Sequence, residues 1–297
     1  MVPNSLVRDV FDHVCRKDAL GIGCETGVPG LFAIANLETT ACFSAFYEPI
    51  MCLVLQGAKE AQMGGRVIRY SAGDTLIVSH AVHVEAAVIQ ASPDAPYTAL
   101  ALRLDLGLAR SLYDEIGEIE DPGNTSHSVD AAATEAAIID AVGRLFQLHR
   151  DPVEAHALAP LILKEIHFRL LRAEHGGMLR QLLRHESPAS RIAKSISYLR
   201  ENYKTQIPVA ELAAESGMSA SAFHEHFKSV TSTTPLQYQK ELRLLEARRL
   251  LAMGGLSVAA TAYDVGYESP TQFSREFSRK FGLSPSEQKS AGAALTG

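Results

Sequence analysis

A helix pattern that occurs twice in the last third of the chain limits the possible folds more than any other feature. In its second copy Phe273, Phe277 and Phe281 recur at every fourth residue, so they line one face of a helix that must be buried. Ser269 is a favourable capping residue, and Pro270 suits the first helical position. The sequence therefore predicts a helix that begins at about residue 270 and packs against a core.

The ends of this helix carry further local signals. Gln272 follows Ser269 by three residues, where its side chain can return a hydrogen bond to the N–H of the capping residue. Gly282 can end the helix in the left-handed conformation, and Pro285 follows shortly afterwards. We therefore expect both ends of this helix to be well defined.

The opposite face of the same helix is polar. At about 100° per residue, the positions away from the phenylalanines are Thr271, Arg275 and Ser278, with Arg279 at the edge. A polar face with arginine on a firmly capped helix suits the major groove of DNA. The alternative is a surface helix whose arginines only meet solvent.

The first copy of the pattern favours the DNA-reading interpretation. Fifty residues separate each member of the first copy from its equivalent in the second, and the glycines of the two turns are separated by forty-nine: Ser219 and Ser269, Phe223 and Phe273, Phe227 and Phe277, Pro235 and Pro285, Gly217 and Gly266. The sequence therefore predicts two helix-turn-helix units, at about 208–230 and 258–281. Between them we predict a helix over 236–252 with Leu242, Leu245 and Leu250 inward, about 25 Å long.

The outward positions of the first copy are less basic. Ser221, Glu225 and Lys228 are equivalent to Thr271, Arg275 and Ser278. A glutamate near phosphates is unfavourable unless it accepts from a cytosine amino group, so we expect the second helix to read more bases. The predicted DNA contacts are Ser221, His224, Glu225, Lys228, Thr271, Gln272, Arg275, Ser278 and Arg279.

Residues from about 188 to 297 resemble the C-terminal DNA-binding domain of the AraC/XylS family of bacterial transcription regulators. The match is carried by Gly266-Tyr267-x-Ser269-x-x-x-Phe273-Ser274-Arg275-x-Phe277-x-x-x-Phe281-Gly282-x-Ser284-Pro285, and by Ala247-Arg248-x-Leu250-Leu251. It departs from the family pattern at residues 231–234, where the family commonly has a glycine. The resemblance implies binding to double-stranded promoter DNA, as activator or repressor, with RNA polymerase as a further candidate partner.

The net charge of −6 conceals two halves of opposite sign. Residues 188–297 hold 13 Lys and Arg against 10 Asp and Glu, whereas residues 1–187 hold 15 against 24. Because phosphate contacts depend on local charge, a modestly basic module beside an acidic domain is compatible with DNA binding.

The N-terminal half reads as short strands separated by turn residues, typical of a small antiparallel barrel or jelly roll. The predicted strands span 31–36, 40–46, 50–56, 66–70, 75–79, 82–90 and 97–104. The run Tyr47-x-Pro49-x-x-x-x-Val54-x-Gln56-Gly57-x-Lys59, followed by Tyr70-x-Ala72-Gly73, resembles the cupin-type N-terminal domain of one branch of the same family, over about 25–170. The resemblance implies a pocket for a small-molecule effector.

A metal site is the main alternative for this half, because His80, His83 and Glu85 have a suggestive spacing. In a strand, positions 83 and 85 share one face and 80 takes the other, so the three converge only with a bulge. We therefore predict no metal, no cofactor and no catalytic residues. The rival interpretations are a metal-dependent cupin enzyme with a DNA-binding tail and an effector-independent regulator.

Residues 106–185 show a helical period, with Ser128 as the predicted cap of an alanine-rich helix. Over 158–171 the apolar residues lie three and four apart and suit either packing within the chain or a homodimer contact: Leu158, Leu161, Ile162, Ile166 and Leu170. Residues 186–190 read as a linker, with Ser190 capping the next helix.

We therefore predict an α+β chain of two domains. Residues 1–185 form a cupin-like effector and dimerisation domain with helices, and residues 191–297 form an all-α DNA-binding domain. Cys15, Cys24, Cys42 and Cys52 lack metal-site spacing and are expected to be free thiols. Charged residues in the first dozen positions and the lack of a long apolar run predict a cytoplasmic protein without membrane partners.

Overall fold

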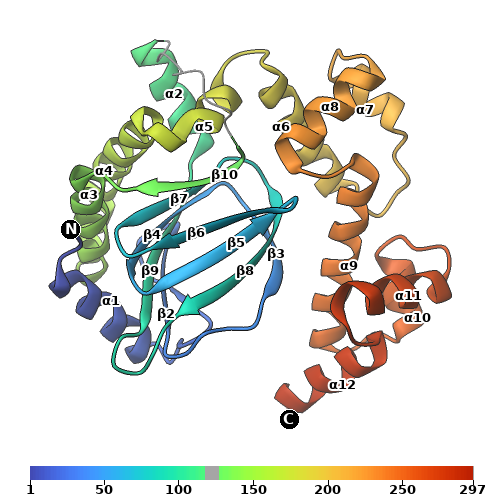
Figure 1. Cartoon of the computed structure of the whole chain (residues 1–297), viewed down its shortest axis with the longest axis horizontal. Helices are drawn as coiled ribbons and strands as arrows, with labels where there is room; N and C mark the ends of the chain where they lie inside the picture. Colours follow the sequence, from blue (N-terminus) through green and yellow to red (C-terminus); the bar gives the residue numbers. More distant parts are fainter. Residues whose placement is uncertain (118–126, 297) are drawn as a thin grey trace. The chain divides into compact units, whose positions relative to one another are not determined.

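The computed structural model describes residues 1–117 and 127–296, which divide into two compact units, Met1–Ser190 and Arg191–Gly297. Figure 1 labels most of the helices and strands. Within the described residues no helix is both long and apolar enough to cross a membrane.

Two antiparallel sheets form the centre of the N-terminal unit. One has six strands in the order β1-β2-β9-β4-β7-β10, and the other has four in the order β3-β8-β5-β6. Their bounds are β1 Cys24–Glu25, β2 Leu31–Asn36, β3 Phe43–Tyr47, β4 Ile50–Gln56, β5 Ala58–Met63, β6 Arg66–Ser71, β7 Asp74–Val78, β8 Val82–Gln90, β9 Tyr97–Arg103 and β10 Val129–Ala133. The predicted antiparallel β domain is therefore confirmed, as two sheets rather than one closed ring of strands.

Alternating apolar side chains bring the two sheets together. In β8, Val82, Val84, Ala86 and Val88 are buried while the residues between them are not. They share a core with residues of the larger sheet such as Val54 and Leu76. Strand β4 is buried along five successive residues, because helix α1 as well as the second sheet packs against it.

The strand predictions for 31–36, 50–56 and 82–90 are confirmed to the residue, and the other four differ only at their ends. Strand β5 was missed, because Ala58–Met63 contains no β-branched or aromatic residue. It is a strand because β6 and β8 pair with it on both sides. The two-residue strand β1 was also missed, because it is too short to show a strand pattern in the sequence.

The prediction that Ser128 caps a helix is wrong. The residues after it form β10, which pairs with β7 from Val129 opposite Val78 to Ala133 opposite Asp74. The open edge of β7 supplies hydrogen-bond partners that outweigh the helical preference of alanine. The alanine-rich helix starts later, at Ala136.

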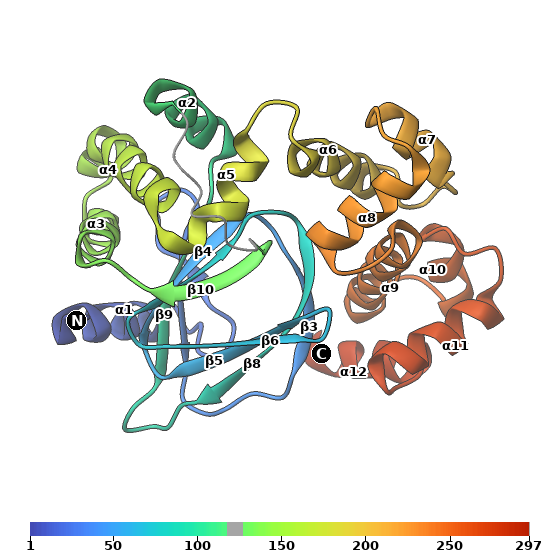
Figure 2. The same ribbon diagram turned by 45° about the horizontal axis from the view of Figure 1, so that its top comes forward.

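Helices surround the sheets of this unit. They are α1 Asn4–Arg16, α2 Leu106–Ile116, α3 Ala136–Gln147, α4 Pro152–Arg172 and α5 Gly177–Leu183, with 3-10 turns at Leu148–Arg150 and Glu174–Gly176. Helices α3 and α4 pack side by side in both views (Figures 1 and 2). Asp151 caps α4 by accepting from the N–H groups of Val153 and Glu154, and the predicted helix over 158–171 is confirmed.

The helix after the predicted linker begins earlier than expected. Helix α6 spans Pro188–Glu201, so residues 188–190 are helical and Ser190 is not its cap. The N–H of Ser190 donates to the Oγ of Ser187 over 3.0 Å, which gives Ser187 the capping role. Pro188 is preorganised for the first turn, as proline at this position usually is.

The C-terminal unit is all helical, as predicted. After α6 come α7 Val209–Glu215, α8 Ala220–Thr231, α9 Pro235–Met253, α10 Val258–Asp264, α11 Pro270–Phe281 and α12 Pro285–Thr296. In the first half Phe223 and Phe227 are buried, and Phe227 meets the ring of Tyr238 on α9 edge to face at 5.7 Å. Phe273 and Phe277 take the same places in the second half, while Phe281 is half-buried.

The predicted inward face of α9 is wrong by about one position. Its buried residues are Pro235, Tyr238, Gln239, Leu244, Ala247 and Leu251. Leu242, Leu245 and Leu250 are half-buried, and Leu250 packs at the rim of the second phenylalanine cluster. Because α9 has neighbours on several sides, its apolar residues form no single stripe from which a face can be read.

Candidate functional site

The turn before α11 is held by a close backbone approach. Gly266 has φ +90°, and a Cβ built on it would meet the carbonyl oxygen of Lys204 at an impossibly short distance. The N–H of Tyr267 donates to the carbonyl of Ala262 over 2.9 Å and closes the turn. Only glycine fits this position, so the turn of the second helix-turn-helix is fixed against the segment between α6 and α7.

Helix α11 has the predicted cap at each end. The Oγ of Ser269 accepts from the N–H of Gln272 over 3.3 Å, and Gly282 is left-handed with φ 72°. The sequence predicted that the side chain of Gln272 would bind the N–H of the capping residue. It donates instead to Glu276 over 3.3 Å. A carboxylate one turn further on attracts the amide N–H groups of Gln272 more strongly than a neutral partner does.

The outward face of α11 is open. Thr271, Gln272, Arg275 and Arg279 are exposed, and Ser278 is half-buried. Within the part of the chain that the structure describes, Arg275 and Arg279 form no ion pair. Two guanidinium groups one turn apart are therefore free to meet an anion or a base edge.

The inner edge of α11 is tied to α9 by a carboxylate. Glu276 accepts from the hydroxyl of Tyr267 over 2.8 Å and from Lys240 on α9 over 3.1 Å. Burial raises the pKa of Glu276, but the hydrogen bonds from Tyr267, Gln272 and Lys240 outweigh it and hold that pKa below its usual value. Glu276 therefore remains charged and fixes the rotation of α11, a role that sequence reasoning missed.

The first helix-turn-helix has the same plan. The Oγ of Ser219 accepts from the N–H of Ala222 over 3.3 Å, and Gly217 takes a positive φ of 61° in the turn. Of the predicted contacts on α8, Ser221, His224, Glu225 and Lys228 are all exposed. Their contact with DNA stays a prediction, as it does for the residues of α11.

The end of α8 explains the departure from the family pattern at residues 231–234. Ser232 takes the left-handed conformation, with φ 59°, that Gly282 takes after α11. The Oγ1 of Thr231 accepts from the N–H of Thr233 over 3.3 Å and stabilises this bend. A serine therefore fills the glycine position at some cost in backbone strain.

Two polar side chains of α9 bind the segment between α6 and α7, and one of them also binds the turn of the second helix-turn-helix. Arg243 donates to the carbonyls of Tyr203 and Gly266 over 2.7 and 2.8 Å, and to those of Lys204 and Thr205 over 3.2 and 3.0 Å. Gln239 donates to Tyr203 and Thr205 as well. This clamp ties the turn before α11 to the segment between α6 and α7 within the C-terminal unit. The sequence carries no local signal for it.

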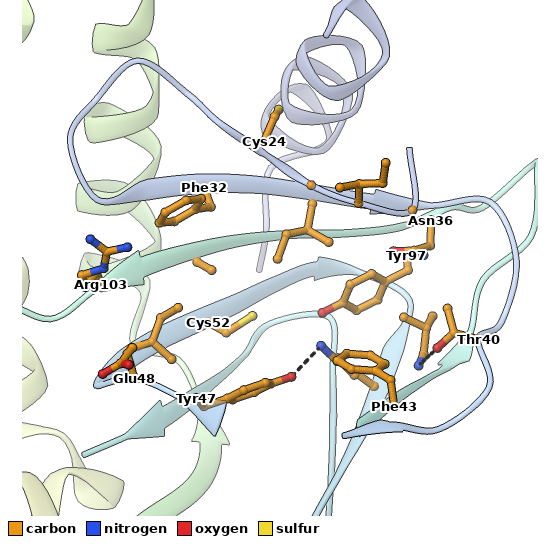
Figure 3. A pocket seen from close by; sticks show the side chains of 18 of the residues that line it. Cys24, Phe32, Asn36, Thr40, Phe43, Tyr47, Glu48, Cys52, Tyr97 and Arg103 are labelled. Carbon is orange, nitrogen blue, oxygen red and sulfur yellow. Dashed lines mark hydrogen bonds between the residues drawn. The ribbon is translucent and has the colours of Figure 1, made fainter. Parts of the chain in front are cut away.

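The N-terminal unit contains a pocket of about 670 Å³ between its sheets. Residues of β1, β2, β3, β4, β5, β6, β8 and β9 line it, most of them apolar or aromatic. Figure 3 shows Tyr47, Cys52 and Tyr97 pointing into the same space. A cavity of this size and lining suits a small organic molecule.

The residues weighed as metal ligands lie outside this pocket and are engaged elsewhere. His80 is buried, its Nδ1 lies 2.8 Å from the Oγ of Ser79, and burial lowers its pKa to about 4. His83 meets the ring of Phe46, and Glu85 accepts from Ser44 over 3.3 Å. Among residues 1–117 and 127–296, no three His, Cys, Asp or Glu side chains are grouped to hold a metal. Cys15, Cys24, Cys42 and Cys52 form no disulfide within the described residues.

Two family models match the chain. The N-terminus of AraC-type transcriptional regulators matches residues 27–178, about half of the chain, and a helix-turn-helix domain matches residues 212–290. The chain belongs to the AraC-type transcriptional regulators. This AraC-type regulator therefore has both the N-terminal domain and the helix-turn-helix domain that its sequence indicated.

Several proteins are similar to this AraC-type regulator. The virulence regulon transcriptional activator VirF of Yersinia enterocolitica is 30% identical over 142 residues, which are 47% of this chain and 51% of VirF. The transcriptional activator RhaS of Escherichia coli is 32% identical over 100 residues, 34% of this chain and 36% of RhaS. The chain thus matches about half the length of VirF and about a third of RhaS.

ToxT of Vibrio cholerae has the same fold. An apo form with one substituted residue superposes with a TM-score of 0.60 at 12% identity, covering 87% of this chain and 96% of ToxT. A form bound to unsaturated fatty acid gives 0.59 at 13% identity and covers 87% and 92%. At these identities the likeness concerns the fold alone.

Proposed function

We propose that this AraC-type regulator binds double-stranded promoter DNA through α8 and α11. The observation that carries the proposal is the pair of helices with capped N-termini and exposed polar faces, joined by one clamped helix. Helices presented in this way enter the major groove in helix-turn-helix proteins. RNA polymerase as a further partner, and the cytoplasm as location, follow from promoter binding in a bacterium.

We further propose that a small molecule in the pocket of the N-terminal unit controls this binding. The pocket lies between the two sheets and is lined mainly by apolar side chains. A solved form of ToxT, which shares the fold, is bound to an unsaturated fatty acid. An effector role fits a family of transcription regulators better than catalysis does, so we propose that the chain acts by binding rather than as an enzyme.

The test of DNA reading compares two arginine variants and one glutamate variant. We expect Arg275→Ala to lower affinity by about 1–3 kcal/mol and to relax preference at one base pair, because arginine donates two hydrogen bonds to guanine. Arg279→Ala should weaken all sequences alike and reduce the salt dependence by about one unit. Glu225→Gln should leave specificity unchanged if Glu225 only lies near the backbone.

The measurement uses duplexes selected by the full chain from a random library. Binding isotherms for each variant, against every single-base change in the selected site, separate base reading from phosphate contact. An effect of Glu225→Gln larger than that of Arg275→Ala would reverse the proposed order of the two helices. A wild-type chain that selects no sequence and shows no salt-sensitive binding would reject the function.

A homodimer formed through α4 is proposed from its exposed apolar side chains. Leu158 and Leu161 are 43% and 66% exposed, and Val153 is 79% exposed on the first turn. Leu170, which the sequence placed with them, is fully buried and belongs to the core. We therefore expect Leu158→Glu with Leu161→Glu to give a folded monomer in sedimentation, whereas Leu170→Glu should unfold the domain.

Leu236 on α9 offers a matched control. It is 66% exposed, the same as Leu161, but belongs to the C-terminal unit. Leu236→Glu should therefore leave the sedimentation coefficient of the dimer unchanged. If the variant with both α4 glutamates sediments as the wild type does, α4 is not the contact.

A further inference from the structure

The pocket of the N-terminal unit contains a buried ammonium group. Lys59 on β5 is 8% exposed and lines the pocket, in line with Tyr70 on β6 and Val88 on β8 across the sheet. A lysine withdrawn from water to this degree usually has a carboxylate partner, because burying a charge alone is costly. Its surroundings therefore indicate what the pocket is built to hold.

Lys59 has few partners of its own. Its Nζ donates to the hydroxyl of Tyr47 over 3.1 Å and lies 5.2 Å from the ring centre of Phe43. No carboxylate among residues 1–117 and 127–296 forms an ion pair with it. An ammonium group has three N–H donors, so two remain without an acceptor in the described part of the chain. The contacts of the charge among these described residues are the rings of Phe43 and Tyr47 and the hydroxyl of Tyr47.

Two buried hydroxyl groups in the same pocket also lack acceptors. Among the residues that the structure describes, the hydroxyl of Tyr70 has no hydrogen-bond partner, and that of Tyr97 lies beside the thiol of Cys52 without a bond of normal geometry. Burial raises the pKa of both phenols well above the usual value, so each keeps its proton and can donate. Buried donors without acceptors are rare in folded proteins and mark a place for a ligand or water.

Two carboxylates also line the pocket, but Glu25 is exposed and Glu48 is only half-buried, and neither forms an ion pair with Lys59 in the described part of the chain. Burial raises the pKa of Cys52, so it stays a neutral thiol. The second cation of the pocket, Arg103, is exposed and lies over the ring of Phe32 at 5.7 Å. The interior therefore presents one positive charge and hydroxyl donors, surrounded by apolar side chains that include Phe32, Ile34, Ile50 and Val88.

We propose that the pocket binds a monoanionic organic molecule with an apolar body, whose carboxylate lies against Lys59. The inference rests on the proposed regulator function and adds the class of its effector. Tyr70 and Tyr97 donate to the carboxylate oxygens, and the apolar lining covers the body of the molecule. The buried ammonium group neutralises one charge, and the other cation of the pocket, Arg103, is exposed, so a dianion would keep a second charge without a buried partner.

The test measures the binding of charged and neutral probes with the same apolar body to the full chain. The carboxylate probes are 4-phenylbutanoate and decanoate, and their neutral partners are 4-phenylbutanamide and decan-1-ol. Binding is followed by calorimetry and by thermal shift. We expect the wild type to bind the carboxylates about tenfold or more tightly than the neutral partners, because charge-assisted hydrogen bonds are lost with the charge. Lys59→Met should abolish this preference and leave DNA binding without probe intact.

Arg103→Met is the matched control, since it removes the exposed cation of the same pocket and should keep the preference. Lys59→Arg retains the charge and covers the case in which Lys59→Met does not fold. Tyr70→Phe should weaken the carboxylates severalfold and leave the neutral partners unchanged. Equal binding of charged and neutral probes, an unchanged preference in Lys59→Met, or no binding of either carboxylate at millimolar concentration would each overturn the inference. Loss of DNA binding in the wild type would reject the proposed function instead.

Discussion

Gly266→Ala is expected to destabilise the C-terminal unit by about 3 kcal/mol and to abolish DNA binding at about 37 °C. The new Cβ would collide with the carbonyl oxygen, carbonyl carbon and Cα of Lys204, and the backbone would have to keep a φ of +90° that alanine disfavours. Because all three contacts are backbone atoms, no side chain can rotate away. The turn before α11 would therefore have to move.

Gly282→Ala separates the two causes. Gly282 has a positive φ of 72° but nothing within 4 Å of a built Cβ. Its replacement should cost only the backbone strain, about 1–2 kcal/mol. Urea unfolding of the full chain, with hydrogen exchange at α9 and α11 to follow this unit alone, provides the comparison. Equal losses in the two variants would show that the contact with Lys204 has no energetic weight.

Arg243→Met is expected to cost about 3 kcal/mol and to weaken binding to two-part sites more than to single half-sites. The substitution keeps most of the apolar stem but leaves the carbonyls of Tyr203, Lys204, Thr205 and Gly266 without the guanidinium donor. Burial lowers the pKa of Arg243, although an arginine remains charged throughout the physiological range. The spacing of α8 and α11 should therefore become less well defined.

Arg249 on the same helix provides the control. It is exposed and pairs with Glu246 three residues earlier, over 2.6 Å. Surface pairs of this kind contribute little, so Arg249→Met should leave both stability and site spacing unchanged. Binding to selected sites whose half-sites are moved apart by one base pair at a time measures the spacing. A variant Arg243→Met with the spacing profile of the wild type would contradict the clamp.

The helix ends and three of the strands followed from the sequence because their signals are local. Ser269, Pro270 and Gly282 act on the backbone within one turn, and the alternation in β8 concerns neighbouring residues. The outward faces of α8 and α11 followed from the same periodicity, since the buried phenylalanines fix the rotation of each helix. These features depend on few distant contacts.

The predictions that failed concern segments whose structure depends on contacts with distant parts of the chain. Residues 58–63 and 129–133 have little strand preference of their own and become strands because β6, β7 and β8 offer hydrogen-bond partners. The inward face of α9 was misplaced because several neighbours, rather than one core, surround it. Ser190 lost the capping role to Ser187 because both serines precede apolar helical residues and only the backbone geometry distinguishes them.

By itself the sequence determined that this protein has a β domain followed by two helix-turn-helix units, because periodicity, caps and turn residues act within a few positions. Only the tertiary structure decided that Arg243 clamps the turn before α11 to the segment between α6 and α7, and that Lys59, Tyr70 and Tyr97 meet in one pocket. Lys59 and Tyr97 lie on strands far apart in the chain, and their burial depends on the packing of one sheet against the other. The charge of a lysine is visible in a sequence, but its lack of a counter-ion is visible only in the fold.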